Sequence, residues 1–166
     1  MKGIVRSLSL LVLLTIPASV SGQTFVELDS DGQLGNGPDV MGGVPSDAVR
    51  VDVYLHHTTF FCSVNVVLCA PCAVVDSVKY WTIWTNSPPV IADSCLTLVS
   101  TGFAFCEPLI SPPTQYASVW YVIQKCMCQV TVEEDQSSWF DNQFNSGSFA
   151  GSVPIGLCDG IAATEG

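Results

Sequence analysis

The chain has 166 residues, of which 48% are hydrophobic and 12% are charged, and its formal net charge is −10. Five basic residues against 15 acidic ones exclude a surface for nucleic acid or anionic lipid, because such binding rests on many contacts between cations and phosphates. The length is sufficient for one hydrophobic core, so we expect one domain.

The first 22 residues are typical of a secretory signal peptide. Lys2 and Arg6 precede an apolar run from Leu8 to Ile16, and small residues before Gln23 fit a cleavage site. We therefore expect residues 1–22 to be removed and residues 23–166 to form one secreted domain, either extracellular or on the cell surface. Removal leaves three basic residues against 15 acidic ones, a net charge of −12. No later apolar run approaches the roughly 20 residues of a transmembrane helix, so no membrane span is expected.

The first half of the mature chain predicts a series of strands. A short strand at 23–28 is followed by a loop over 29–47, where glycine and proline interrupt regular structure. Apolar and polar residues then alternate strictly over 48–55, which indicates a half-buried strand. Further strands are predicted over 60–69 and from about 77 to 84, with a turn between them.

The second half continues this pattern. Short strands are predicted over 95–99 and 102–106, and residues 116–124 are apolar on both faces, which indicates a central strand. A strand over 126–133 follows, and the polar remainder predicts a loop with one last strand near 148–153. No segment carries the apolar stripe of a helix. The chain therefore predicts an all-β fold, an antiparallel β-sandwich of jelly-roll or immunoglobulin-like type with about seven to nine strands.

Eight cysteines all lie in the predicted mature domain. They are Cys62, Cys69, Cys72, Cys95, Cys106, Cys126, Cys128 and Cys158. Their even number, together with export, favours a disulfide-braced sandwich. Cys69 and Cys72 have the spacing of zinc ligands, but the second pair is C-x-C, which favours disulfides over zinc. The pairing is open, although Cys126 and Cys128 share one side of a strand and are expected to have separate partners.

The acidic loop contains the candidate metal ligands Asp29, Asp31 and Asp39. The segment Asp29-Ser-Asp-Gly resembles the start of a calcium loop, because carboxylates beside a glycine turn present several oxygens to one cation. The sixth and twelfth residues are Leu34 and Val40, which do not fit an EF-hand. A solvated loop is therefore favoured, with no cofactor, and calcium is the alternative.

No pattern of catalytic residues is present. His56 and His57 are consecutive on a strand end, so their rings point to opposite faces, and we expect them in an exposed turn. No nucleophile motif accompanies them. The acidic run Glu133-Glu-Asp135 is expected to be a solubilising turn rather than the carboxylate pair of a hydrolase. We therefore expect no enzymatic activity.

Four tryptophans provide the candidate ligand-binding surface. Core packing is expected to take at least two of them, because large aromatic side chains supply much of a sandwich core. Trp84 and Trp139 lie beside turn residues and are therefore expected to be the exposed pair. If the domain binds carbohydrate, these two are its candidate ligand-binding residues.

The order and pattern of the strands resemble a known family. The segments are Val49–Leu55, Val64–Leu68, Val119–Ile123, Cys128–Val132 and the aromatic stretch 144–149. Together they resemble the cohesin-like domains of bacterial extracellular proteins. This resemblance implies a nine-stranded jelly-roll sandwich and non-catalytic recognition, in some members of dockerin partners. The high cysteine content departs from that pattern.

The resulting hypothesis is a secreted, non-catalytic β-sandwich for extracellular recognition or cell-surface structure, with a protein partner. The alternative is a carbohydrate-binding module with a polysaccharide partner, and a more distant one is a secreted hydrolase. An exposed row of coplanar tryptophans would favour sugar, whereas an apolar sheet face would favour protein.

Overall fold

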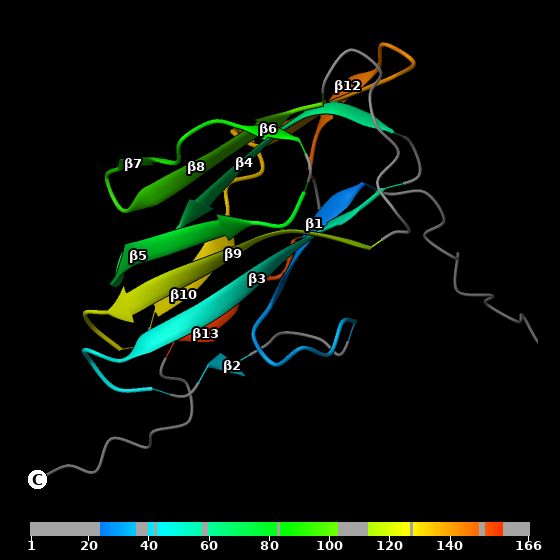
Figure 1. Ribbon diagram of the computed structural model, residues 1–166. Coiled ribbons are helices and arrows are strands. Elements are labelled where there is room, and N and C mark those ends of the chain that lie inside the picture. The colour runs from blue at the N-terminus through cyan, green and yellow to red at the C-terminus, as the bar shows by residue number, and fades with distance from the viewer. Residues whose placement is uncertain are drawn as a thin grey trace, which may run out of the picture.

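The computed structural model describes residues 24–35, 40–41, 43–57, 60–82, 84–102, 113–126, 128–149 and 152–157. In this described part the chain is all-β, without a helix. Its thirteen strands form a four-stranded and a nine-stranded sheet, and the two sheets make a sandwich (Figure 1). Five strands have only two or three residues, and the eight longer ones agree with the expected seven to nine. The predicted antiparallel β-sandwich is confirmed.

The smaller sheet has the strand order β1-β3-β9-β5, and every pair in it is antiparallel. Its strands are β1 (Phe25–Asp29), β3 (Ala48–His56), β9 (Thr114–Ile123) and β5 (Ala73–Tyr80). Alternation in β3 buries Val49, Val51, Val53 and Leu55 and leaves the residues between them outward. Strand β9 is paired on both sides, which confirms the central strand predicted from its apolar run.

The larger sheet follows the order β12-β11-β4-β10-β13-β2, with β8 also pairing with β4 and the short strands β6 and β7 pairing with β8. Its longer strands are β4 (Phe61–Cys69), β8 (Cys95–Thr101), β10 (Cys128–Val132) and β11 (Ser138–Asp141). Its short strands are β2 (Val40–Met41), β6 (Thr85–Asn86), β7 (Val90–Ala92), β12 (Ser146–Ser148) and β13 (Ile155–Leu157). Among the described strand pairs, only the pairing of β13 with β2 is parallel.

The core lies between the sheets and consists mainly of valine, leucine and aromatic side chains. The largest fully buried side chains include Tyr116, Tyr121, Phe61 and Phe149. Tyr116 and Ser100 share a hydrogen bond of 2.8 Å between their hydroxyl oxygens. Burial raises the pKa of both buried tyrosines far above the ordinary value, because the ionised form loses its hydration.

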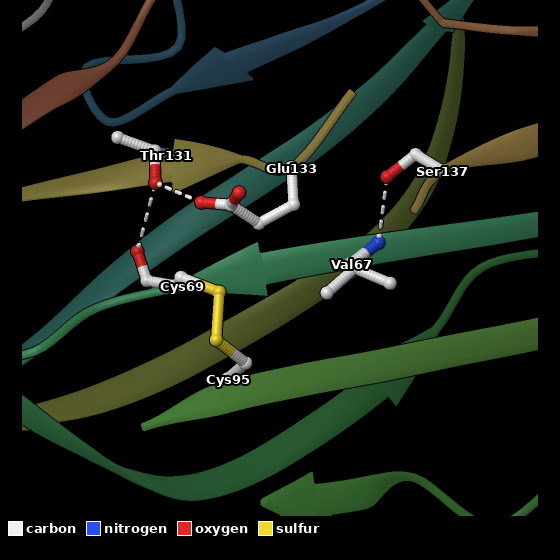
Figure 2. Close-up of a disulfide and its surroundings, with 6 residues drawn as sticks. All are labelled: Val67, Cys69, Cys95, Thr131, Glu133 and Ser137. Atoms are coloured by element: carbon white, nitrogen blue, oxygen red, sulfur yellow. Dashed lines mark hydrogen bonds between the residues drawn. A yellow bond between two sulfur atoms is a disulfide. The ribbon is translucent and has the colours of Figure 1, made fainter. Parts of the chain in front are cut away.

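A disulfide joins two neighbouring strands of the larger sheet. Cys69 ends β4 and Cys95 begins β8, directly opposite it in the register, with their Cα atoms 4.0 Å apart (Figure 2). Beside the bridge, Thr131 Oγ1 donates to the Cys69 carbonyl at 3.4 Å. Farther along β4, the Val67 amide donates to Ser137 Oγ at 2.9 Å (Figure 2). The bridge thus fixes β4 to β8 at the end of the ladder.

The other cysteines agree with the disulfide hypothesis where the structure describes them. Cys62, Cys72 and Cys126 are also disulfide-bonded. Cys106 and Cys158 lie outside the described residues, as does the side chain of Cys128. The separate partners predicted for Cys126 and Cys128 therefore stay a prediction.

Two segments differ from the expected elements. The strand expected over 77–84 runs over 73–80. The sequence pattern misplaces its start because a bulge between Val75 and Ser77 breaks the two-residue period. The tail was expected to hold one strand near 148–153 but forms β11, β12 and β13 instead. Strand β11 pairs with β4 and β13 pairs with β10, so partners distant in sequence define these short strands.

In the described part, no helix is long and apolar enough to cross a membrane.

Candidate recognition face

The outward side of the four-stranded sheet carries aromatic and charged side chains together. We call this surface the outer face. It consists of Glu27, Arg50, Asp52, Tyr54, Lys79, Trp81, Ser118 and Trp120. The antiparallel register places Arg50 beside Trp120, and Ser118 between Asp52 and Lys79. Four strands therefore bring to one surface residues that are far apart in the sequence.

Asp52 is the centre of a hydrogen-bond network on this face. Arg50 donates from Nε at 2.8 Å and from Nη2 at 2.7 Å, a bidentate ion pair. Ser118 Oγ donates to Asp52 Oδ1 at 2.5 Å. These contacts provide the Asp52 carboxylate with hydrogen-bond donors from within the sheet. The Arg50 side chain keeps an exposed fraction of 47%.

Two tryptophans extend the network at its ends. Trp81 Nε1 donates to Ser118 Oγ at 2.7 Å, and the Lys79 ammonium lies 3.5 Å from the centroid of the Trp81 ring. On the other side, the Arg50 guanidinium carbon lies 5.7 Å from the Trp120 ring centroid. Cation–π contacts of this kind favour such placements by about 0.5–1 kcal/mol at exposed sites. The side chains of the outer face are therefore linked to one another by contacts within the chain.

The charge of the outer face differs from that of the whole chain. Only three of the five basic residues lie after residue 22, and Arg50 and Lys79 are two of them. The acidic side chains here are Asp52, Glu27 and Asp29, which the register places opposite Asp52, so they exceed the two basic ones by one. Burial, followed by the nearby Asp52 charge, raises the pKa of Tyr54 on the same face. Because this face holds basic side chains on an otherwise acidic protein, they reduce the repulsion of an acidic partner here.

The structure corrects the expectation for the tryptophan pair. Trp84 was predicted to be exposed but has 5% exposure and packs 6.4 Å from the Tyr116 ring. It lies where the chain passes from β5 in one sheet to β6 in the other, so both layers enclose it. Trp81, with 44% exposure, lies on the outer face instead. Trp81 lies two residues after Lys79 of β5, and a spacing of two along a strand places side chains on the same face. This spacing was the signal in the sequence for the position of Trp81.

Trp139 lies on β11 in the larger sheet, away from Trp81 and Trp84. Its ring is half-buried and packs 5.7 Å from Phe61. Trp139 Nε1 donates to the Ser148 carbonyl at 3.3 Å. A Cβ at Gly147 would lie 2.9 Å from this ring, so glycine is what lets the ring lie across β12. The predicted sugar-binding pair is therefore not brought together.

The two histidines also differ from the expected exposed turn. His57 is buried, with its ring 5.1 Å from Phe61. His56 points outward, as the opposite-face argument predicts, and stacks on Phe25 with centroids 4.0 Å apart. Its Nε2 lies 2.5 Å from Glu27 Oε2. His57 Nε2 lies 3.4 Å from the hydroxyl oxygen of Thr114.

The carboxylates of the acidic loop stabilise the turn. Asp29 Oδ1 accepts from the amides of Asp31 and Gly32 at 3.0 and 2.8 Å. Asp31 Oδ1 in turn accepts from the Gln33 amide at 2.8 Å. No group of three potential metal ligands occurs in the described residues, and Asp39 lies outside them. The calcium alternative stays a prediction.

The second acidic segment, 133–135, also makes a contact within the chain. Glu134 accepts a hydrogen bond from the Ser152 amide at 3.0 Å, which connects this segment to the tail.

No protein-family model matches the sequence, and no curated protein matches it either. Solved structures are similar in fold. The sixth cohesin from scaffoldin B of Acetivibrio cellulolyticus, in complex with a dockerin, has a TM-score of 0.60 at 12% identity, over 81% of this chain and 99% of that chain. CaCohA2 from Clostridium acetobutylicum has a TM-score of 0.59 at 15% identity, over 84% and 94%. A non-cellulosomal cohesin from Archaeoglobus fulgidus gives 0.57 at 10%, over 82% and 90%. The resemblance to cohesin-like domains is thus confirmed at the level of the fold.

Proposed function

We propose that this protein is a secreted, non-catalytic recognition module that binds a protein partner through the outer face. The observation that carries the proposal is the ordered chain of contacts from Trp81 through Ser118 and Asp52 to Arg50. The cohesin-like fold supports it, since one similar structure is a cohesin with a bound dockerin. The predicted signal peptide at 1–22 supports a place outside the cell.

The composition of the outer face fits a protein interface. Tryptophan, tyrosine and arginine carry most of the binding energy in such interfaces. Because Arg50 is already paired with Asp52, a partner that covers Arg50 does not leave its charge without a counter-charge. The network also reduces the side-chain entropy that binding would otherwise cost. A sheet face whose side chains are already held by contacts within the chain is therefore suited to a protein surface.

The carbohydrate alternative has less support from the same residues. Lys79 holds its ammonium over the Trp81 ring, on a face that a sugar ring would use for stacking. Trp84 and Trp139 offer no exposed aromatic platform, because the first is buried and the second packs on Phe61. Protein recognition is therefore the function we propose.

The test is affinity capture with purified protein, using the extracellular proteins and the insoluble polysaccharides of the source organism. We expect one protein to be retained by the unmodified chain and lost with Trp81→Ala or Arg50→Ala. The matched control is Val90→Ala, which changes an exposed side chain on β7 in the other sheet. Binding to a polysaccharide that depends on Trp81 would contradict the proposal, and so would turnover of a glycoside or peptide substrate.

A further inference from the structure

A groove of about 240 Å³ runs beside β1, at the edge of the four-stranded sheet. It is lined by residues 25–28, Gly35, His56 and Val153. Phe25 and Glu27 belong to the outward side of β1, whereas Val26 and Leu28 point into the core. Successive residues of a strand face opposite sides, so a groove lined by four in a row follows the edge of the backbone.

The edge that faces this groove is one end of its sheet. Among the described strands, β1 pairs with β3 alone. The paired residues run from Phe25 opposite His56 to Asp29 opposite Asp52. The amide and carbonyl groups of a strand alternate between its two edges, so an end strand offers one set to a further strand. An extended peptide can use this set for main-chain hydrogen bonds.

The walls of the groove are held in place by contacts within the chain. Glu27 Oε1 accepts from the Gly35 amide at 2.6 Å, and Glu27 Oε2 lies 2.5 Å from His56 Nε2. The His56 and Phe25 rings are stacked with an angle of 9° between their planes. Val153, which is 47% exposed, gives the groove an apolar residue from the segment before β13.

We propose that this groove binds an extended, basic peptide segment of a partner protein as an added strand on β1. An apolar side chain of the peptide fills the groove, which has room for one, since a cavity of roughly 150 Å³ holds benzene. Basic residues on either side are favoured because the chain has a net charge of −10, and because Glu27 and Asp29 belong to β1 and Asp31 follows it closely. The site is separate from the network of Trp81 and Arg50, so it does not depend on the proposed function.

The test is a nuclear magnetic resonance titration of the ¹⁵N-labelled domain with the peptide acetyl-Lys-Val-Lys-Val-Lys-Val-Lys-amide. We expect saturable shifts of the amides of residues 25–29 and of Val153. A peptide of the same sequence with every backbone amide N-methylated cannot donate along either edge, and we expect at least tenfold weaker binding. A peptide with glutamate in place of lysine should also bind at least tenfold more weakly, because it loses the charge attraction.

Two matched variants locate the site. Val153→Arg places charge and bulk at the groove, so we expect at least tenfold weaker binding of the lysine peptide. Val90→Arg adds the same charge at a valine of 59% exposure on β7 and should bind as the unmodified chain does. Trp81→Ala should also leave the affinity unchanged, which separates this site from the network of Trp81 and Arg50. A titration that does not saturate would overturn the proposal. Equal affinity for the N-methylated peptide would do the same, and so would equal effects of the two arginine variants.

Discussion

Removal of the Cys69–Cys95 disulfide by the double substitution Cys69→Ala and Cys95→Ala tests how the sandwich is stabilised. The bridge closes a loop with a sequence separation of 26 residues. In the chain-entropy estimate, a loop of that length restricts the unfolded chain by about 3.5 kcal/mol at 25 °C. Seven register pairs between β4 and β8 hold the two positions together without the bridge, so the native state should change little.

Cys72 lies within this loop and is itself disulfide-bonded, so the unfolded chain already carries another restriction. The figure of about 3.5 kcal/mol is therefore an upper value. For a domain of this size, a loss of about 2 to 3.5 kcal/mol corresponds to a fall in Tm of roughly 4 to 14 °C.

The assay is urea unfolding of the oxidised variant and of the unmodified chain, followed by circular dichroism. We expect a lower midpoint, because the variant's unfolded chain gains entropy. A loss below about 1 kcal/mol would refute the loop-closure reasoning. A loss above about 6 kcal/mol would mean that the bridge also holds native packing, against the register argument. The exposed substitution Val90→Ala serves as the control.

Three further predictions concern single side chains. Trp84→Ala should destabilise the fold by about 3 to 5 kcal/mol because it empties a core site, whereas Trp81→Ala should cost less, and thermal unfolding compares them. Phe144 is 86% exposed and has a φ of 65°, so Phe144→Gly should leave stability unchanged or raise it by up to about 1 kcal/mol in urea unfolding; a clear loss would contradict this. Tyr116 and Tyr121 have raised pKa values when folded, so their contribution to stability is present below the ordinary tyrosine pKa of about 10 and is lost above it. Absorbance titration should therefore show two of the four tyrosines ionising only on unfolding, and early ionisation of all four would exclude their burial.

The sequence alone was sufficient for the fold class. Period-two alternation in 48–55 and the apolar run before Gln124 correspond to β3 and to the central strand β9. These patterns are local, because a strand with one buried face must alternate and a strand covered on both faces need not. That cysteines such as Cys69 and Cys95 are disulfide-bonded followed from an even cysteine count and the predicted export, but their pairing with each other did not.

Only the tertiary structure decided which surfaces exist. The outer face joins Arg50 to Trp120 and Lys79 to Ser118 across strand pairs that are more than 35 residues apart in sequence, and no local pattern records such a register. The exchange of roles between Trp81 and Trp84 depended on where the chain crosses from one sheet to the other. Local composition determines which side chains can be buried, whereas strand pairing and sheet packing determine which of them are, because burial is a property of neighbours that the chain brings together only when it folds.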